Sequence, residues 1–335
     1  MVSDESADLA FKFQFIVNRQ PRGRKWRGGS DATGLNLGDA WIAYEDIRST
    51  IRVRRRLLLY FRQLTNPGSL IQSDLTGQLA LFGHVAIGVY GNRAAKLKLK
   101  IDRASSAAHA EWKRAQLLAA GRADQFRAVT CPDCQSTVDL SGMPSAPYTY
   151  CPCCQTVFAA DSILTRGEEY RICTTCGFFG RVRDFTEWYF MFVVIIIAYQ
   201  SQKKQLCGRC RSSLKWGMFF GNLLIGFLGI FPYIVWRLCT MERPNASNRA
   251  LRRSRQLARK GKVQRLSEVY RPVYEFWPDH PGLLFNEAIA CVNAGDQPGA
   301  IERTRRLSKA CPNFLLHAEQ FLNIHRISPS LLRGT

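Results

Sequence analysis

Four C-x-x-C pairs within eighty residues constrain this chain more than any other feature of its 335-residue sequence. A turn that carries two thiolates two residues apart presents both sulfurs to one tetrahedral ion, and a second such turn completes a site of four cysteines. Chance placement of twelve cysteines would give less than one such pair. The spacing therefore predicts two closed metal sites. Their candidate ligands are Cys131, Cys134, Cys151, Cys154, Cys173, Cys176, Cys207 and Cys210.

In the first predicted site, sixteen residues separate Cys134 from Cys151, which is enough for a small hairpin. This spacing resembles that of the zinc ribbon family, and the resemblance implies a structural Zn²⁺ within residues 128–165. Cys153 could replace Cys151 or Cys154 in the second turn. Cys154 is the predicted ligand because it preserves the C-x-x-C spacing. Iron–sulfur and redox uses of these thiols are the alternatives.

In the second predicted site, at 170–212, thirty residues separate Cys176 from Cys207. They include the apolar stretch WYFMFVVIIIAY at 188–199, which is too short for a membrane-spanning helix. Its β-branched and aromatic composition predicts a strand or a long hairpin arm of an enlarged ribbon around a second Zn²⁺. All five histidines lie outside both sites, and no coordination position is left for a substrate, so both sites are predicted to be structural.

The charge balance favours an anionic partner. The chain carries 47 Lys and Arg against 26 Asp and Glu, a formal net charge of +21, with basic clusters at 19–27, 52–56 and 249–265. Nucleic acid and an anionic lipid surface both fit this balance, and plain solubilising charge is the alternative. The acidic start MVSDESADLAFKF does not predict a secretory signal. We therefore expect reduced thiols in a cytosolic setting rather than disulfides.

The first block, 10–127, reads as short strands followed by one helix. The predicted strands are FKFQFIV (11–17), WIAYEDI (41–47), IRVRRRLLLYF (51–61), QLALFG (78–83), VAIGVYG (85–91) and KLKLKID (96–102). A helix is predicted over 105–126, with Asp102 or Ser105 as its cap. This order resembles the pleckstrin-homology-like fold, which implies a module that binds lipid headgroups or peptides. Another β-barrel or α+β domain is the alternative.

The segment 213–241 is apolar, and between Trp216 and Trp236 its one strongly polar side chain is Asn222. It is long enough to span a bilayer, but both flanks are basic, and Gly226, Gly229 and Pro232 interrupt it. A re-entrant or interfacial hairpin at the cytoplasmic face of a membrane is therefore predicted; a true span and a buried core element are the alternatives. The stretch NLLIGFLGIFP is similar to a segment that follows the ribbon in some bacterial zinc-ribbon membrane proteins.

The last block, 247–330, reads as helices, with two helical stretches around the turn NAGDQPG and a capping helix at 314–325. Pro278 and Pro312 lie 34 residues apart, the period of the tetratricopeptide repeat. Ala300 and Leu307 match that family's small and apolar positions, and Leu284 and Ala288 fit its first helix. Ala288 departs from the family in replacing a usual glycine, and Cys291 and Thr304 in replacing aromatic residues. The resemblance implies a protein-binding groove. An unrelated helical bundle is the alternative. Cys291 and Cys311 are predicted to be buried apolar fillers.

Together these patterns predict an α+β multidomain protein with a β-rich domain, two zinc ribbons, an apolar hairpin and C-terminal helices. No nucleophile–base set, carboxylate pair or phosphate loop stands out in the sequence. We therefore expect a non-enzymatic adaptor or scaffold that meets an anionic membrane surface and recruits a protein partner through its C-terminal helices. A nucleic-acid-binding protein is the competing class, in which Trp26, among Arg24, Lys25 and Arg27, would stack on a base.

Overall fold

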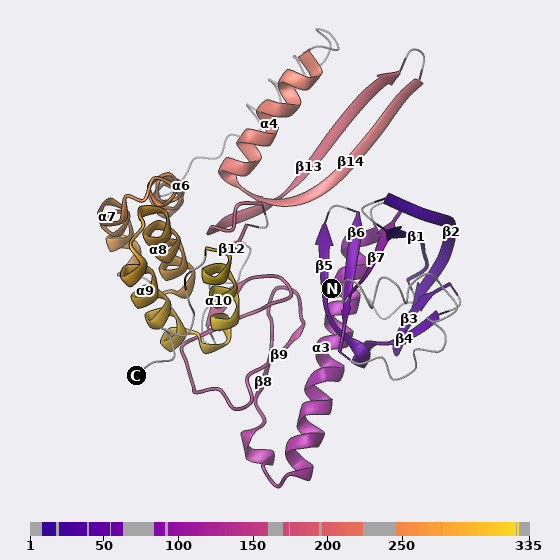
Figure 1. The fold of residues 1–335 in the computed structure, drawn as a ribbon, viewed down its shortest axis with the longest axis horizontal. Coiled ribbons are helices and arrows are strands. Elements are labelled where there is room, and N and C mark those ends of the chain that lie inside the picture. The colour runs from indigo at the N-terminus through magenta and orange to yellow at the C-terminus, as the bar shows by residue number, and fades with distance from the viewer. Residues whose placement is uncertain are drawn as a thin grey trace. The chain divides into compact units, whose positions relative to one another are not determined.

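The computed structural model describes residues 9–17, 20–38, 40–53, 55–62, 84–90, 93–159, 170–173, 175–193, 196–223, 246–275, 277–325 and 327. The chain divides into two compact units. The first comprises Met1–Gly142 and Cys151–Cys154, and the second comprises Met143–Tyr150 and Gln155–Thr335. Across the described residues the fold is mixed α+β, with an N-terminal antiparallel sheet and seven α-helices (Figure 1).

The N-terminal sheet has seven antiparallel strands in the order β4-β3-β2-β1-β7-β6-β5. They are β1 Phe11–Val17, β2 Gln20–Ser30, β3 Gly34–Leu37, β4 Ala40–Ala43, β5 Ile47–Val53, β6 Arg56–Phe61 and β7 His84–Val89. The prediction for 11–17 is confirmed: Phe11, Phe13 and Phe15 all enter one hydrophobic core. The predicted strand at 85–91 is likewise confirmed as β7.

One long helix, α3 (Arg93–Ala119), follows the sheet. The predicted strand at 96–102 is wrong, because these residues belong to the helix. Ala94, Leu97 and Ile101 recur with the helical period, and their burial in the core favours a helix over a strand. The predicted cap at Asp102 or Ser105 is also wrong, since both residues are buried inside the helix. The Asp102 carboxylate accepts hydrogen bonds from Thr50 and Lys98, and burial raises its pKa.

The basic stretch at 19–27 lies largely in strand β2, where half-buried Trp26 packs against the core and beside Gly38. A ring held in this way is a poor platform for a nucleobase. The predicted strand at 51–61 is two strands, β5 and β6, paired from Ile47↔Phe61 to Val53↔Arg56. WIAYEDI spans the end of β4, a 3-10 turn (Tyr44–Asp46) and the start of β5. The predicted strand at 78–83 lies outside the described residues.

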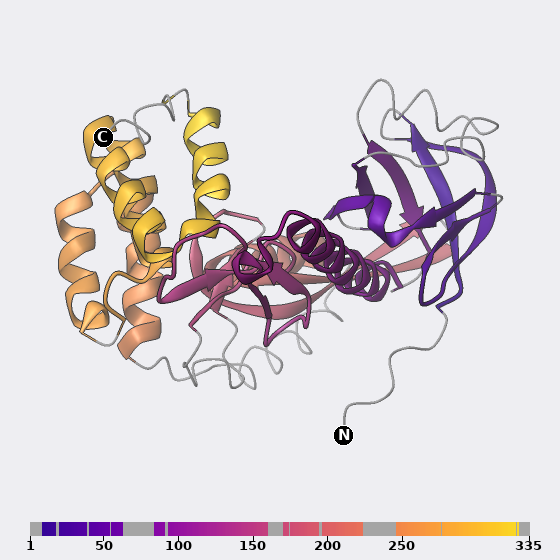
Figure 2. The same cartoon turned by 90° about the horizontal axis from the view of Figure 1, so that it is seen from below.

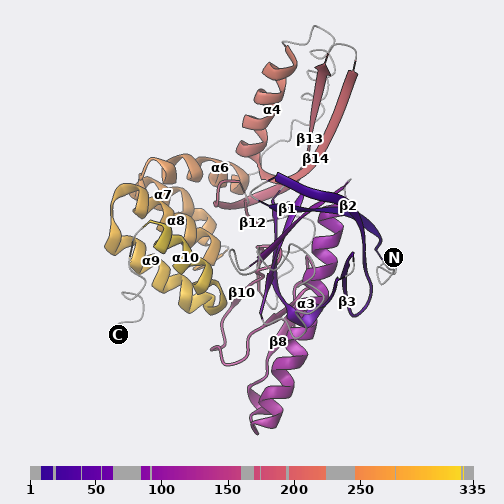
Figure 3. The same cartoon turned by 45° about the vertical axis from the view of Figure 1, so that its right-hand side comes forward.

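Short hairpins carry the cysteine pairs. They are formed by β8 (Ala128–Thr130) with β9 (Thr137–Asp139), and by β10 (Tyr148–Tyr150) with β11 (Val157–Ala159). Strand β12 (Tyr170–Ile172) pairs with β13 (Phe179–Val193), which forms a long hairpin with β14 (Ile196–Cys207). The predicted strand character of 188–199 is confirmed, but the prediction of a single arm is wrong, because the stretch supplies the end of β13 and the start of β14, which pair with each other. Helix α4 (Gly208–Leu223) lies along this hairpin (Figures 1 and 3).

The predicted apolar hairpin or span at 213–241 is described only to Leu223, the last residue of α4, because residues 224–245 lie outside the described residues. Among the helices that the structure does describe, none combines the length and the apolar character that crossing a bilayer requires.

The C-terminal block is helical, as predicted. It comprises α6 Ala246–Arg259, α7 Val263–Tyr274, α8 Pro281–Ala294, α9 Gln297–Ala310 and α10 Leu315–Ile324, drawn side by side in orange to yellow in Figure 2. The expected turn forms because Gly295 adopts a φ of 76° and the Asp296 carboxylate accepts from the Gly299 amide at the start of α9. Cys291 and Cys311 are fully buried, which confirms their predicted role as fillers.

Candidate metal centres

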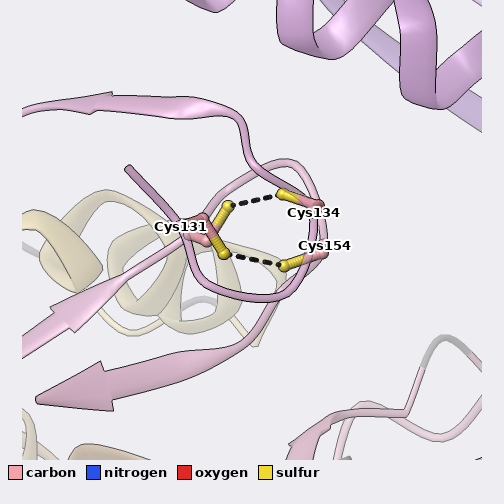
Figure 4. A group of neighbouring side chains, drawn as sticks. Cys131, Cys134 and Cys154 are labelled. Atoms are coloured by element: carbon pink, nitrogen blue, oxygen red, sulfur yellow. Dashed lines mark hydrogen bonds between the residues drawn. The ribbon is translucent and has the colours of Figure 1, made fainter. Parts of the chain in front are cut away.

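The first cysteine cluster gathers the sulfurs of Cys131, Cys134, Cys151 and Cys154, all within 4.8 Å of one another. The Sγ–Sγ distance is 3.6 Å for Cys131–Cys154, both labelled in Figure 4, and 3.5 Å for Cys134–Cys151. Four thiolates at about 2.3 Å from a tetrahedral Zn²⁺ lie about 3.8 Å apart, so this geometry fits the ion. The cluster contains Cys154 rather than Cys153.

The turns that carry these pairs depend on one backbone conformation. The residue after the second cysteine has a positive φ in three of the four pairs: 60° at Gln135, 63° at Gln155 and 71° at Gly177. The left-handed conformation reverses the direction of the chain at the turn. The Gln135 and Gly177 amides therefore donate to the carbonyls of Cys131 and Cys173, at 2.9 and 2.8 Å. Glycine adopts the conformation without steric cost, whereas the two glutamines are held there by the turn.

Helix α3 holds the first cluster through the backbone of its turns. Arg103 Nε donates to the Cys134 carbonyl at 2.7 Å, and Lys98 Nζ donates to the Cys153 carbonyl at 3.2 Å. The amide of Thr137 donates to Ser106 Oγ at 3.0 Å. Sequence reasoning missed Lys98 and Arg103 because it placed residues 96–102 in a strand and began the helix at residue 105. The helical spacing of the buried residues of α3 is the signal that could have found them.

The second cluster gathers Cys173, Cys176, Cys207 and Cys210, again within 4.8 Å of one another, with 3.7 Å between the sulfurs of Cys176 and Cys207. Here one cysteine ends strand β14 and the next ligand lies in the first turn of α4. The cluster therefore joins the base of the long hairpin to the start of the helix that lies along it.

Arg255 of α6 contacts a sulfur of this second cluster. Its Nη1 donates to Cys207 Sγ at 3.2 Å, and its guanidinium lies 5.9 Å from the centre of the Phe178 ring. Arg255 is 8% exposed, so this is a buried charge. Four thiolates around a divalent cation carry net negative charge, and a guanidinium at hydrogen-bond distance offsets it. The sequence placed Arg255 within a basic cluster but gave no sign of this partner, 48 residues away.

The thiols of each cluster shift one another's proton affinity. The pKa of Cys134 is lowered by a hydrogen bond from Cys131, and the pKa of Cys173 is lowered by one from Cys176. Conversely, the neighbouring thiols raise the pKa of Cys151 and of Cys176. Because a metal binds the thiolate form, metal binding releases the protons that these thiols carry.

Two asparagines of the C-terminal helices hold strands that adjoin the clusters. Asn286 Oδ1 accepts from the Phe179 amide and its Nδ2 donates to the Phe179 carbonyl, both at 2.9 Å. Asn313 does the same at Tyr150, with distances of 3.0 and 2.7 Å. Each side chain therefore takes the place of a neighbouring strand. Tyr150 ends β10 and Phe179 begins β13, so within the second unit each asparagine holds the end of one strand.

Comparisons of the chain with protein-family models, with curated proteins and with solved structures each give no match. The candidate site consequently rests on its own geometry. That geometry consists of two clusters of four cysteines, each compatible with one tetrahedral zinc ion whose four positions are filled by sulfur.

Proposed function

We propose that this protein is a zinc-stabilised, non-enzymatic adaptor that associates with the cytoplasmic face of an anionic membrane. The observation that carries the proposal is the polarity of α4 as it leaves the second cysteine cluster. Its first two turns carry Arg209, Arg211 and Lys215, and from Trp216 onward the sequence is apolar. A basic band followed by an apolar segment matches the order of headgroups and acyl chains.

In this proposal each cluster binds one Zn²⁺ as a structural ion. Four thiolates favour zinc over the oxygen-preferring Mg²⁺ and Ca²⁺, and the filled coordination shell suits structural rather than catalytic use. The ions fix the ends of the ribbons, and the ribbons position the hairpin β13–β14 and α4. Metal binding then supplies folding energy that such short hairpins cannot supply alone.

The N-terminal sheet acts in this proposal as a pleckstrin-homology-like module. Seven antiparallel strands followed by α3 support that assignment, as does packing of Leu97 and Ile101 of α3 into the core of the sheet. A module of this kind adds a second contact with lipid headgroups, or with a peptide. Its strands β5 and β6 and the turn between them supply basic side chains for the purpose, including Arg52, Arg55 and Arg56.

The C-terminal helices act as tetratricopeptide-like repeats that recruit a protein partner. Their Asn286 and Asn313 already hold the chain's own strands, so we place the partner on α10. That helix exposes Leu316 at 67% and Ile324 at 78%. Large apolar side chains this exposed on one short helix are typical of a protein-binding surface.

Nucleic-acid binding is the second candidate, and one observation favours it. Trp112 on α3 is 50% exposed, with the Arg62 guanidinium 5.8 Å from its ring centre and His109 stacked beside it at 5.6 Å. An aromatic ring beside cationic groups can stack on a base. Nucleic-acid binding accounts for neither the apolar half of α4 nor the apolar character of the sequence at 213–241, so we rank it second.

Binding of the purified, zinc-loaded chain to lipid vesicles tests the proposal. We expect it to bind vesicles that contain phosphatidylserine, to bind pure phosphatidylcholine less well, and to lose affinity as salt rises. Arg209→Glu should weaken binding about fivefold or more, because each basic residue contributes about 1 kcal/mol at such a surface and the new carboxylate is repelled by it. Lys309→Glu, a charge reversal at another exposed position, on α9, is the matched control. Absence of vesicle binding together with tight, salt-sensitive RNA or DNA binding would replace the proposal with the second candidate.

A further inference from the structure

The hairpin β13–β14 changes polarity along its length. Its strands pair without a register shift from Val182↔Cys207 to Val193↔Ile196. The half nearest the cysteine cluster carries the charged residues, which are Arg183, Asp184, Glu187, Lys203 and Lys204. The four residue pairs nearest the turn are all apolar or aromatic: Phe190↔Tyr199, Met191↔Ala198, Phe192↔Ile197 and Val193↔Ile196.

This pattern leaves no polar face at the turn end of the hairpin. Successive residues of a strand lie on opposite faces, so a hairpin in water keeps at least one face polar by alternation. Over these four pairs there is no alternation, and both faces are therefore apolar. A single helix alongside covers at most one of them. The other face needs an apolar environment from outside this pair of strands.

Helix α4 changes polarity in the same direction as the hairpin. It starts directly after Cys207 and runs beside the hairpin toward its turn (Figures 1 and 3). The last basic residue of its described part is Lys215, about 11 Å along the helix from Gly208. The basic residue of β14 nearest the turn is Lys203, about 14 Å from Cys207. Both elements thus pass from basic to apolar at a similar distance from the second cysteine cluster.

We propose that the turn end of β13–β14 and the apolar half of α4 insert together into one leaflet of an anionic bilayer. This inference rests on the proposed membrane association and names a second inserting segment for it. The positions of Lys203 on β14 and Lys215 on α4 then fall at the level of the lipid phosphates. The aromatic positions 188, 189 and 199 of the paired strands fall nearer the turn, at the boundary between headgroups and acyl chains. Amphipathic rings concentrate at that level, and basic side chains gain from anionic headgroups.

The insertion is shallow. The four apolar pairs span about 10 Å along the strands, which matches the depth of about 5–10 Å reached by interfacial elements. Deeper insertion would carry the outer edges of a two-stranded hairpin, with their unpaired amides and carbonyls, into hydrocarbon. The hairpin therefore acts as a wedge in one leaflet and does not cross the membrane.

Sedimentation of the full-length, zinc-loaded chain with vesicles containing about a third phosphatidylserine tests the inference. Phe192→Glu places a carboxylate at the inserting end and should lower the partition coefficient by about tenfold or more, whereas Phe192→Ala should lower it severalfold. Thr186→Glu adds the same charge on the same strand, opposite Lys203, and should leave partitioning within about twofold. Unchanged zinc content shows that each variant is folded.

The outcomes separate this inference from the proposed function. If the wild-type chain does not bind vesicles, membrane association itself fails and the inference falls with it. If the wild-type chain binds and both Phe192 variants bind equally well, the hairpin is not inserted, although the proposed function stands. If the wild-type chain dimerises without lipid and Phe192→Glu abolishes the dimer without affecting vesicle binding, the turn end meets a second copy instead of lipid.

Discussion

The two cysteine clusters have the same set of ligands, four cysteine thiols, but the structures around them differ. In the first, short hairpins surround the sulfurs, and α3 holds the backbone of the turns through Lys98 and Arg103. In the second cluster, the chain between the cysteine pairs forms the long hairpin β13–β14. Helix α6 contacts a sulfur of this cluster directly through Arg255. The first cluster is thus enclosed by structure, whereas the second supports structure that extends away from it.

This difference shows how a metal site can be adapted without changing its ligands. The turn geometry fixes only the few residues around each C-x-x-C pair, so the chain between pairs is free to vary in length. Sixteen residues close the first site, and thirty carry the long hairpin from the second. Loss of metal should accordingly have local consequences in each case, but in different parts of the molecule.

The largest effect is expected from replacing a ligand. Cys131→Ser and Cys173→Ser should each remove one of two zinc ions, since metal binding contributes about 10 kcal/mol or more to folding at such sites. Cys131→Ser should expose the amides of β8 and β9 to hydrogen exchange, and Cys173→Ser those of β13, β14 and α4. Loss of both ions from either single variant would show that the two clusters are one cooperative site.

The next largest effect concerns the asparagines that hold the ribbons. Asn286→Ala should lower the free energy of unfolding by about 3 kcal/mol, because it leaves the buried amide and carbonyl of Phe179 without partners. Chemical denaturation of the second unit's helices measures this. Asn323→Ala, at an exposed position of α10, is the control and should change little. A cost below about 1 kcal/mol for Asn286→Ala would mean that the helices do not hold β13.

Arg255→Met should affect the two clusters differently, because among the contacts described only the second cluster has a guanidinium hydrogen-bonded to a sulfur. We expect the zinc affinity of the second cluster to fall about 10- to 100-fold, as for other residues that hydrogen-bond a metal ligand. The first site should keep its affinity, which a chelator competition that resolves the two ions would show. Equal weakening of both sites would assign Arg255 a general role in folding.

The smallest effect comes from pH. Burial lowers the pKa of His280 to about 3, and its Nδ1 accepts from the Gly282 amide at the start of α8. Because a histidine in the unfolded chain has a pKa near 6.5, the unfolded state binds the proton first as pH falls. His280 should therefore cost about 1.2 kcal/mol of stability on going from a pH of about 7 to about 5.5.

His280→Asn keeps an acceptor at the helix start and removes the titration, so it isolates this effect from protonation of the cysteines and of His317, whose pKa burial also lowers. The measured quantity is the difference in unfolding free energy between variant and wild type at the two pH values. A difference that does not change with pH would contradict a buried, neutral His280.

The sequence predicted the metal ligands because the relevant chemistry is local: two thiolates and a left-handed residue fit within five positions, as at Cys131–Gln135. It failed at 96–102, where KLKLKID alternates like a strand but also fits a helix, and only the core of the sheet selects the helix that buries Leu97 and Ile101. The contacts of Arg255 and Asn286 could not be predicted from the sequence, because their partners lie 48 and 107 residues away along the chain. Such contacts depend on tertiary packing, which periodicity does not encode.

The central claim is that zinc in the second cluster positions a membrane-binding segment. Its most direct test is vesicle flotation of Cys173→Ser beside Cys131→Ser, with zinc content measured in each floated and unfloated fraction. We expect Cys131→Ser, which retains the second ion, to float with anionic vesicles as the wild-type chain does, and Cys173→Ser to float much less. Equal flotation of both variants with the wild-type chain would contradict the claim.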